Sequence, residues 1–141
     1  MTVNPSLSAI SPLPWLAIVS ATLVAVGFYP LTQIYQIDED LARGDRTFAA
    51  WIGPRRAFIF AVVVQTIAAA LLVGAIARLL GPWNALLVAA FYTVLLVAIL
   101  RWALVFDNAQ VLANYRRVMR INMLTSLGFL GFISLHLYGL L

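Results

Sequence analysis

The sequence contains no cysteine and no lysine, and only 10% of its 141 residues are charged. Without cysteine there is no disulfide framework, no thiolate metal site and no thiol nucleophile. Soluble domains carry about 25% charged and about 45–50% hydrophobic residues, whereas 64% of this chain is hydrophobic. The composition therefore excludes an ordinary soluble domain and indicates an integral membrane protein.

Charge is missing in four long stretches, which are residues 1–37, 57–77, 79–100 and 121–141. About 20 apolar residues in a helix, rising 1.5 Å each, span a hydrocarbon core of about 30 Å. We therefore expect an all-α fold, an integral membrane four-helix bundle, with transmembrane helices at residues 14–37, 55–80, 84–106 and 121–141. Residues 1–13 are expected to form an N-terminal polar segment, and their lack of a basic region argues against a cleaved signal peptide.

Two polar segments separate these helices, at residues 38–54 and 107–120. Residues 38–56 hold four acidic and four basic side chains, so their charges nearly cancel and favour a structured cap over a repelling loop. In the second segment, Asp107 and Asn108 can cap an amphipathic helix from Ala109 to Arg120.

Arginine supplies the nine basic residues, and eight of them flank the two polar segments while only Arg78 lies at the other end. Cytoplasmic loops carry the basic excess of membrane proteins. We therefore expect a multi-pass protein of the cytoplasmic (inner) membrane, with the acidic segment in the cytoplasm. The net charge of +4 comes from loops at the membrane surface, so we expect membrane lipids as partners and no nucleic acid.

Oxygen-bearing side chains gather where the first helix ends. On a helix, Gln33, Gln36 and Asp40 share one face because they are spaced i, i+3 and i+7. Mg²⁺ prefers carboxylate and carbonyl oxygens, and the neighbouring Arg43 and Arg46 can hold phosphate oxygens. The residues alone leave three interpretations open: a solvated charged loop, an Mg²⁺–diphosphate site, or structural salt bridges.

Residues 29–53 combine three short motifs, which are YPLTQIYQ from Tyr29, ED at 39–40 and RGDRT at 43–47. This stretch resembles the second aspartate-rich motif of the UbiA-type prenyltransferase superfamily, and residues 114–122 resemble the linker before the family's last helix. The resemblance implies an all-helical, nine-helix intramembrane enzyme. Such enzymes use two aspartate-rich motifs to bind Mg²⁺ and a prenyl diphosphate, and they transfer the prenyl group to an aromatic or other lipid-soluble acceptor.

The chemistry of the residues and the resemblance together give three sets of candidate site residues: catalytic Asp40 and Tyr35; diphosphate-binding Arg43, Arg46 and Gln33; and metal-ligating Asp40, Asp38, Glu39 and Gln36. Only Asp40 matches an acidic ligand of the family's motif directly, and Asp38 and Glu39 are expected to compensate for the missing acids. An aromatic ring such as Tyr35 can stabilise a developing allylic cation through its quadrupole. The alternative for Tyr35 is simple packing near the membrane interface.

The chain departs from the family pattern in two ways. Gln33 and Gln36 stand where the family commonly has Asp, and neutral amide oxygens bind Mg²⁺ more weakly. The family's first motif, an Asn followed by spaced Asp residues on an earlier helix, is absent, and the four helices correspond to the last four of nine. We therefore expect the C-terminal half of such an enzyme, inactive without a separate N-terminal half. The alternative is a non-enzymatic four-helix membrane protein, either an assembly subunit or a small transporter.

Polar and aromatic residues inside the helices carry weaker expectations. Gln65 is expected to form an interhelical hydrogen bond, and Arg101 to extend toward the interface, with contact to a diphosphate as its alternative. The tryptophans fall near the expected membrane boundaries and are predicted to be interfacial anchors: Trp15, Trp51, Trp83 and Trp102.

Overall fold

The computed structural model describes the backbone of residues 12–139 and their side chains from residue 15 onward. Within that range every regular element is a helix, which confirms the all-α prediction. Most of the N-terminal segment predicted at residues 1–13 lies outside the described residues.

Within residues 12–139, four helical segments are long and apolar enough to cross a membrane. The elements are α1 (Pro12–Gln33), the 3₁₀ turn η2 (Ile34–Gln36), α2 (Ile37–Arg43), α3 (Phe48–Ile52), α4 (Pro54–Leu79), α5 (Pro82–Leu104) and α6 (Val111–Leu137). α4 and α5 each begin with a proline that follows a glycine of positive φ, 79° at Gly53 and 89° at Gly81. Glycine adopts this backbone conformation without steric cost, and proline suits the first helical position.

The helix boundaries differ from the predicted ones at both polar segments. The first helix is extended through η2 and α2 as far as Arg43. The amphipathic segment and the last predicted helix form one helix, α6, so the predicted loop at residues 107–120 is shorter than expected. The reason is that Asn114, Val118 and Ile121, spaced i, i+4 and i+7, form one continuous buried face.

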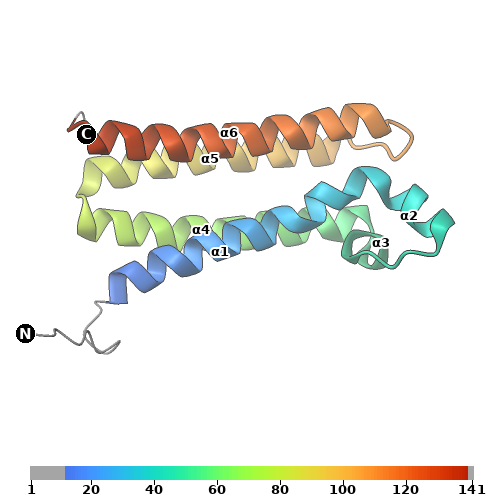
Figure 1. Ribbon diagram of the computed structural model, residues 1–141, viewed down its shortest axis with the longest axis horizontal. Coiled ribbons are helices and arrows are strands. Elements are labelled where there is room, and N and C mark those ends of the chain that lie inside the picture. The colour runs from blue at the N-terminus through green and yellow to red at the C-terminus, as the bar shows by residue number, and fades with distance from the viewer. Residues whose placement is uncertain (1–11, 140–141) are drawn as a thin grey trace, which may run out of the picture.

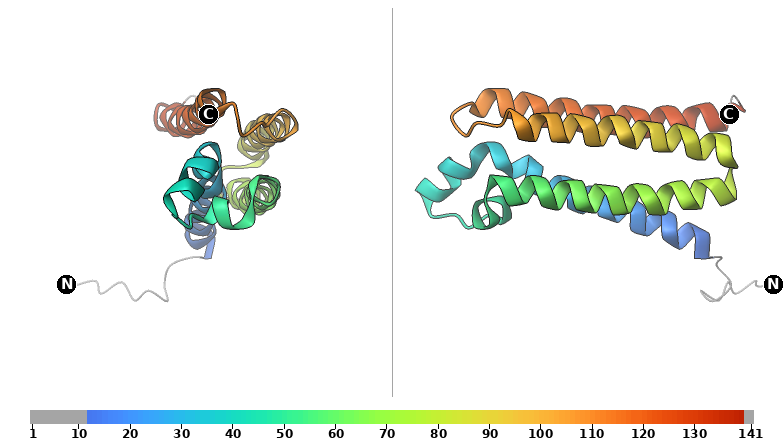
Figure 2. Two further views of the ribbon diagram at one scale, coloured as in Figure 1. Left: turned by 90° about the vertical axis from the view of Figure 1, so that its right-hand side faces the viewer. Right: turned by 180° about the vertical axis from the view of Figure 1, so that it is seen from behind.

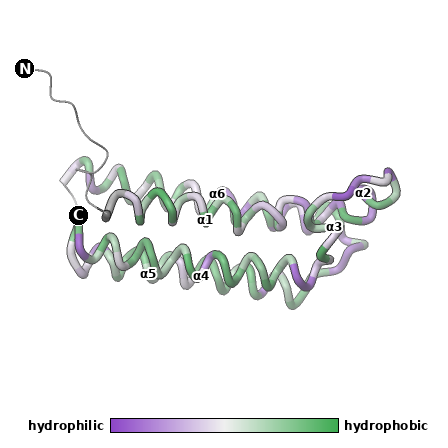
Figure 3. Tube along the Cα trace, turned by 90° about the horizontal axis from the view of Figure 1, so that it is seen from below, coloured by the Kyte–Doolittle hydropathy of each residue, from purple (hydrophilic) through white to green (hydrophobic). Residues whose placement is uncertain are grey.

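The four long helices lie in two layers, α1 with α4 and α5 with α6 (Figures 1 and 2). α2 and α3 form a cap at one end of the bundle, and hydrophilic residues gather at this end (Figure 3). Because α4 and α6 start at the cap and α5 ends there, eight arginines lie at the cap end and Arg78 lies at the other. The one-sided arrangement of basic residues expected from the sequence is therefore present.

Close packing between α1 and α4 depends on small residues. Ala57, Ala61, Ala68 and Ala75 of α4 are all buried, and small side chains let membrane helices approach closely. Gln65 lies in the same stripe and donates a hydrogen bond from Nε2 to the Val24 carbonyl of α1, at 3.0 Å. The predicted interhelical hydrogen bond of Gln65 is confirmed.

The packing of α6 is much looser. After Ile121 no side chain of α6 is buried as far as Leu137. α6 contacts α5 at Gly128, where an added Cβ would overlap the ring of Phe91. An added Cβ at Gly131, three residues further along, would meet no heavy atom within 4 Å.

The difference in space around Gly128 and Gly131 predicts different effects for two matched alanine variants. Gly128→Ala should destabilise the α5–α6 contact by about 1–3 kcal/mol, because Phe91 must move to make room. Gly131→Ala should be neutral or slightly stabilising, since alanine favours helix over glycine. Unfolding of the purified protein in mixed micelles, followed by circular dichroism, measures both. Equal effects of the two variants would contradict this packing.

The arginine distribution generates a prediction of topology. In this cysteine-free chain, single cysteines at Ala42 and Ala109, exposed at the cap end, and at Trp83, exposed at the opposite end, report the orientation. In sealed right-side-out vesicles a membrane-impermeant maleimide should label only Trp83→Cys, because the basic end is retained in the cytoplasm. External labelling of Ala42→Cys would reverse the assignment.

Candidate functional site

The cap is formed by a tight turn between α2 and α3. α2 ends at Gly44, which has the left-handed conformation (φ 81°) that glycine favours. The Asp45 amide donates to the Asp40 carbonyl at 2.8 Å, which closes the turn. Thr47 then caps α3, with its Oγ1 accepting a hydrogen bond from the Ala50 amide at 3.3 Å.

Asp40 is the central residue of this cap. Only 1% of its surface is exposed, although it is a carboxylate. Its Oδ1 accepts a hydrogen bond from Nη2 of Arg43 at 2.9 Å, and its Oδ2 accepts one from Oγ1 of Thr47 at 2.9 Å. Both oxygens are thus bonded to protein donors, as a buried carboxylate requires.

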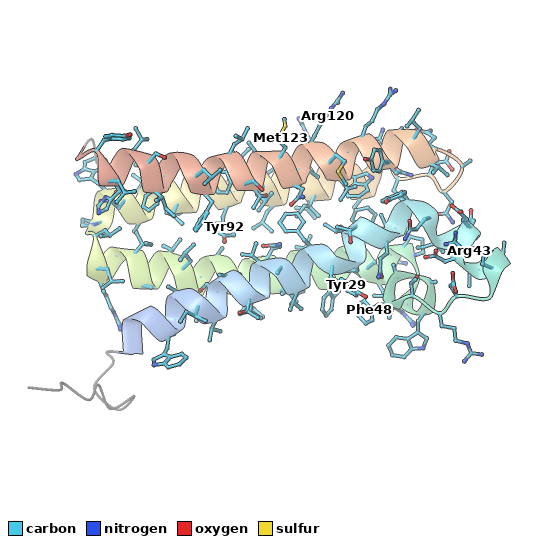
Figure 4. The ribbon with its side chains drawn as sticks, in the orientation of Figure 1. Tyr29, Arg43, Phe48, Tyr92, Arg120 and Met123 are labelled. Atoms are coloured by element: carbon cyan, nitrogen blue, oxygen red, sulfur yellow. The ribbon has the colours of Figure 1, made fainter. Side chains whose placement is uncertain are left out.

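Arg43 joins three carboxylates at the end of the bundle (Figure 4). Besides Asp40, its guanidinium donates to Glu39 at 2.8 Å through Nη1 and to Asp45 at 3.1 Å through Nε. The side chains of Arg43, Glu39 and Asp45 are 54%, 66% and 56% exposed, so the two outer ion pairs contribute little to stability. The Arg43–Asp40 pair matters more, because it neutralises a buried charge.

The other predicted site residues lie around this centre in different environments. Gln33 accepts a hydrogen bond from the Ala49 amide at 3.2 Å, so Gln33 and Asp40 both face the start of α3, as their spacing predicts. Asp38 faces the α5–α6 loop and accepts a hydrogen bond from Asn108 at 3.1 Å. Tyr35 packs edge-to-face against Tyr115 of α6, with 5.3 Å between ring centroids.

Gln36 and Arg46 complete the predicted set. Gln36 lies half-buried in η2, and within the described part of the chain its side chain forms no hydrogen bond. Arg46 is exposed in the turn before α3, and no described carboxylate lies within ion-pairing distance of it. Both side chains are thus placed beside the acidic cluster without being part of its ion pairs.

The acidic cluster has the oxygen donors that a hard cation prefers, but its geometry is that of an ion-pair network. Among the described residues, no three acidic, His or Cys side chains are arranged to hold a metal ion. Glu39, Asp40 and Asp45 instead surround the guanidinium of Arg43. Ligation of a metal by Asp40 would therefore require Arg43 to leave that carboxylate.

A second polar cluster, which the sequence analysis missed, connects α5 to α6. Asn114 is fully buried; its Oδ1 accepts hydrogen bonds from Nε1 of Trp102 at 3.0 Å and from Nη1 of Arg117 at 3.1 Å. Its Nδ2 donates to the Asp107 carbonyl at 2.8 Å. The prediction that Trp102 is an interfacial anchor is wrong, since it is 2% exposed. An asparagine in line with Val118 and Ile121 is the signal that could have revealed the cluster.

Comparison with known proteins adds no family, ligand or partner. No protein-family model, no curated protein and no solved structure matches this chain. The residues of the cap, their geometry and the motif that they form are therefore the features that indicate a function.

The Asp40 geometry predicts the cost of removing its charge. Asp40→Asn weakens two hydrogen bonds to a buried carboxylate and should destabilise the cap by about 1–2 kcal/mol, whereas Asp45→Asn removes only an exposed pair and should cost less than about 0.5 kcal/mol. Hydrogen exchange of the Asp45 and Ala50 amides, both bonded within the cap, measures the difference. Equal protection in the two variants would show that Asp40 does not hold the cap together.

Proposed function

We propose that this chain is the C-terminal half of a UbiA-type prenyltransferase, which transfers an isoprenyl group from a prenyl diphosphate to a lipid-soluble acceptor. The observation that carries the proposal is the gathering of Glu39, Asp40 and Asp45 around one positive charge at the end of a membrane helix. These residues belong to the stretch that resembles the family's second aspartate-rich motif. A carboxylate cluster of this kind is an environment for a cation.

The chemistry of the donors suits Mg²⁺, which when bound would neutralise a diphosphate and help it to leave. Asp40, Asp38, Glu39 and Gln36 are the residues of this chain that would hold the ion, which requires Asp40 to release Arg43 and Asp38 to release Asn108. Two of them, Asp38 and Glu39, are exposed at the cap surface.

Arg43 is the residue that would couple the cluster to a substrate. Its guanidinium is half-exposed, and two of its three partners are exposed carboxylates. Exchanging such carboxylates for a diphosphate costs little, and the planar guanidinium binds phosphate oxygens in a bidentate manner. Arg43 and the exposed Arg46 would therefore bind the diphosphate, while Gln33 positions α3 through its bond to the Ala49 amide.

In the reaction that we propose, the allylic C–O bond breaks and its electron pair goes to the diphosphate, whose charge the arginines stabilise. A nucleophilic carbon of the acceptor then bonds to the allylic carbon, and the proton on that acceptor carbon passes to the released diphosphate. Tyr35 and Tyr115, which pack edge-to-face at the cap end of the bundle, are the aromatic rings whose faces would stabilise the cation.

The loose packing of α6 supports the need for a partner half. From Asn122 to Leu137 the helix buries no side chain, and it carries the small residues Gly131 and Ser134. Small residues are enriched where membrane helices pack against one another. Helices from an N-terminal half, which would also supply the first aspartate-rich motif, would cover this face.

A non-enzymatic assembly subunit is the second candidate. The observation that favours it is the satisfied state of Asp40, whose oxygens are both bonded within the protein. A proton-coupled small transporter is less well supported, because it needs an acidic residue deep in the membrane. Every acidic residue of the chain lies at the cap end: Asp38, Glu39, Asp40, Asp45 and Asp107.

Co-expression with an N-terminal half of a UbiA-type enzyme tests the proposal. The assembled complex should transfer a radiolabelled prenyl group in an Mg²⁺-dependent manner, and the isolated chain should not. Asp40→Asn should lower the rate by about 10²-fold or more, because it removes charge from the cation environment.

Asp107→Asn is the matched control, since it removes a carboxylate at the same end of the bundle but outside the acidic cluster, and it should retain most of the rate. Co-purification of the two halves shows that each variant assembles. A normally assembled complex without prenyl transfer, or one in which Asp40→Asn is as active as the parent, would favour the assembly-subunit alternative.

A further inference from the structure

A second site for an anion lies between α5 and α6, away from the acidic cluster. A hollow of about 240 Å³ opens there at the side of the bundle. Arg101 of α5 and Arg117 and Arg120 of α6 line it, and the apolar side chains of Ala98, Trp102 and Ile121 form much of the remaining wall. Figure 4 shows Arg120 on the side of α6 that faces away from α1.

The three guanidinium groups in this hollow have no acidic partner among the described residues. Within the described residues, every ion pair involves Arg43 of the cap, which does not line the hollow. Arg117 is held by its hydrogen bond to Asn114 at 3.1 Å, which fixes one guanidinium beside the hollow. Arg101 and Arg120 are exposed at the hollow and Arg117 is partly buried, and an anion between the three guanidinium groups would reduce their mutual repulsion.

The hollow lies toward the cap end of the bundle, where we expect the lipid headgroups. Arg101 lies in the last turn of α5, and Arg120 lies about 14 Å along the axis from the start of α6. From this level to the opposite end of the bundle, α5 and α6 contain no Asp, Glu, Lys or Arg and are mainly hydrophobic (Figure 3). An occupant therefore meets positive charge at the headgroup level and an apolar surface beneath it.

We propose that this hollow binds an anionic phospholipid of the surrounding membrane. Its phosphate lies among Arg101, Arg117 and Arg120, and an acyl chain follows the apolar wall formed by Trp102 and Ile121. Basic pockets between transmembrane helices on the cytoplasmic side are general binding places for such headgroups. The site needs neither Mg²⁺ nor an N-terminal half, so it is independent of the proposed function.

A larger groove of about 630 Å³ between α4 and α5 fits this ligand less well. Its wall includes Phe58, Ile59 and Leu100, and Arg55 is its one charged lining residue. Ordinary lipid chains suffice to fill such a groove. Charge complementarity thus favours the hollow between α5 and α6.

Trp102 provides the probe for a direct test. Trp15, Trp51 and Trp83 are exposed, so changing all three to Phe leaves Trp102 as the only tryptophan of the full chain. The protein is reconstituted in phosphatidylcholine vesicles that contain increasing amounts of brominated phosphatidylglycerol or, in parallel, brominated phosphatidylcholine. Bromine quenches tryptophan at short range, so the quenching curves give the relative affinity of each lipid for the hollow.

We expect brominated phosphatidylglycerol to bind more tightly than phosphatidylcholine by roughly tenfold to 10²-fold, since the hollow holds three arginines and each arginine near an anionic headgroup contributes up to about a fivefold gain. The double variant Arg101→Gln, Arg120→Gln should reduce this preference to about fivefold or less, because only Arg117 remains; neither changed side chain forms a hydrogen bond within the described residues, so folding should be preserved. The double variant Arg56→Gln, Arg116→Gln makes the same change of net charge outside the hollow and should keep the preference.

Two outcomes would overturn the proposal. The first is equal quenching by the two brominated lipids, or an equal loss of preference in both double variants, which would indicate only a general surface attraction. The second is loss of the preference on addition of 10 mM inorganic phosphate at constant ionic strength, which would assign the hollow to a free phosphate compound instead of a membrane lipid.

Discussion

The buried carboxylate of Asp40 is the interaction on which the polar end of this protein depends. Its two oxygens bind Arg43 on the helix that leaves the membrane and Thr47 at the start of α3, so one side chain joins the two ends of the turn. The same contact brings Glu39 and Asp45 to the guanidinium. A buried charge without such partners would cost several kcal/mol. Cap folding and the concentration of negative charge therefore have one physical cause, and any cation or diphosphate that acts here must exchange with these partners.

A second constraint is that polar groups inside a membrane protein must be satisfied. The buried side chain of Asn114 is satisfied by hydrogen bonds with Trp102, Arg117 and the Asp107 carbonyl. These bonds fix the start of α6 against the end of α5. Asp38 connects the same loop to α2 through Asn108. The cap end is thus tied together by polar contacts, whereas the opposite half of α6 has no comparable anchor. The proposed lipid site lies at this fixed polar end. The proposed partner half would instead cover the apolar part of α6 that buries no side chain.

Much of this arrangement follows from periodicity and charge. The charge-free runs place four membrane helices, and the arginine asymmetry places both polar segments at one end. Spacing also puts Gln33 and Asp40 on one side of the first helix. The length of α6 was not predicted, because its charged first third suggested a separate surface segment, whereas Asn114, Val118 and Ile121 continue the buried face. Periodicity does not show which donor forms a hydrogen bond with a given carboxylate. The ion pairs of Arg43 and the burial of Trp102 could therefore be known only from the tertiary structure.

We propose that the acidic cluster is a cation site which a partner half and a diphosphate complete. Electron paramagnetic resonance of Mn²⁺, used in place of Mg²⁺, measures this directly in the assembled complex with a non-hydrolysable prenyl diphosphate analogue. The account predicts saturable, stoichiometric binding of Mn²⁺ that Asp40→Asn weakens and that the isolated chain lacks. Absence of Mn²⁺ binding in the assembled complex, or binding that is unchanged by Asp40→Asn, would contradict it.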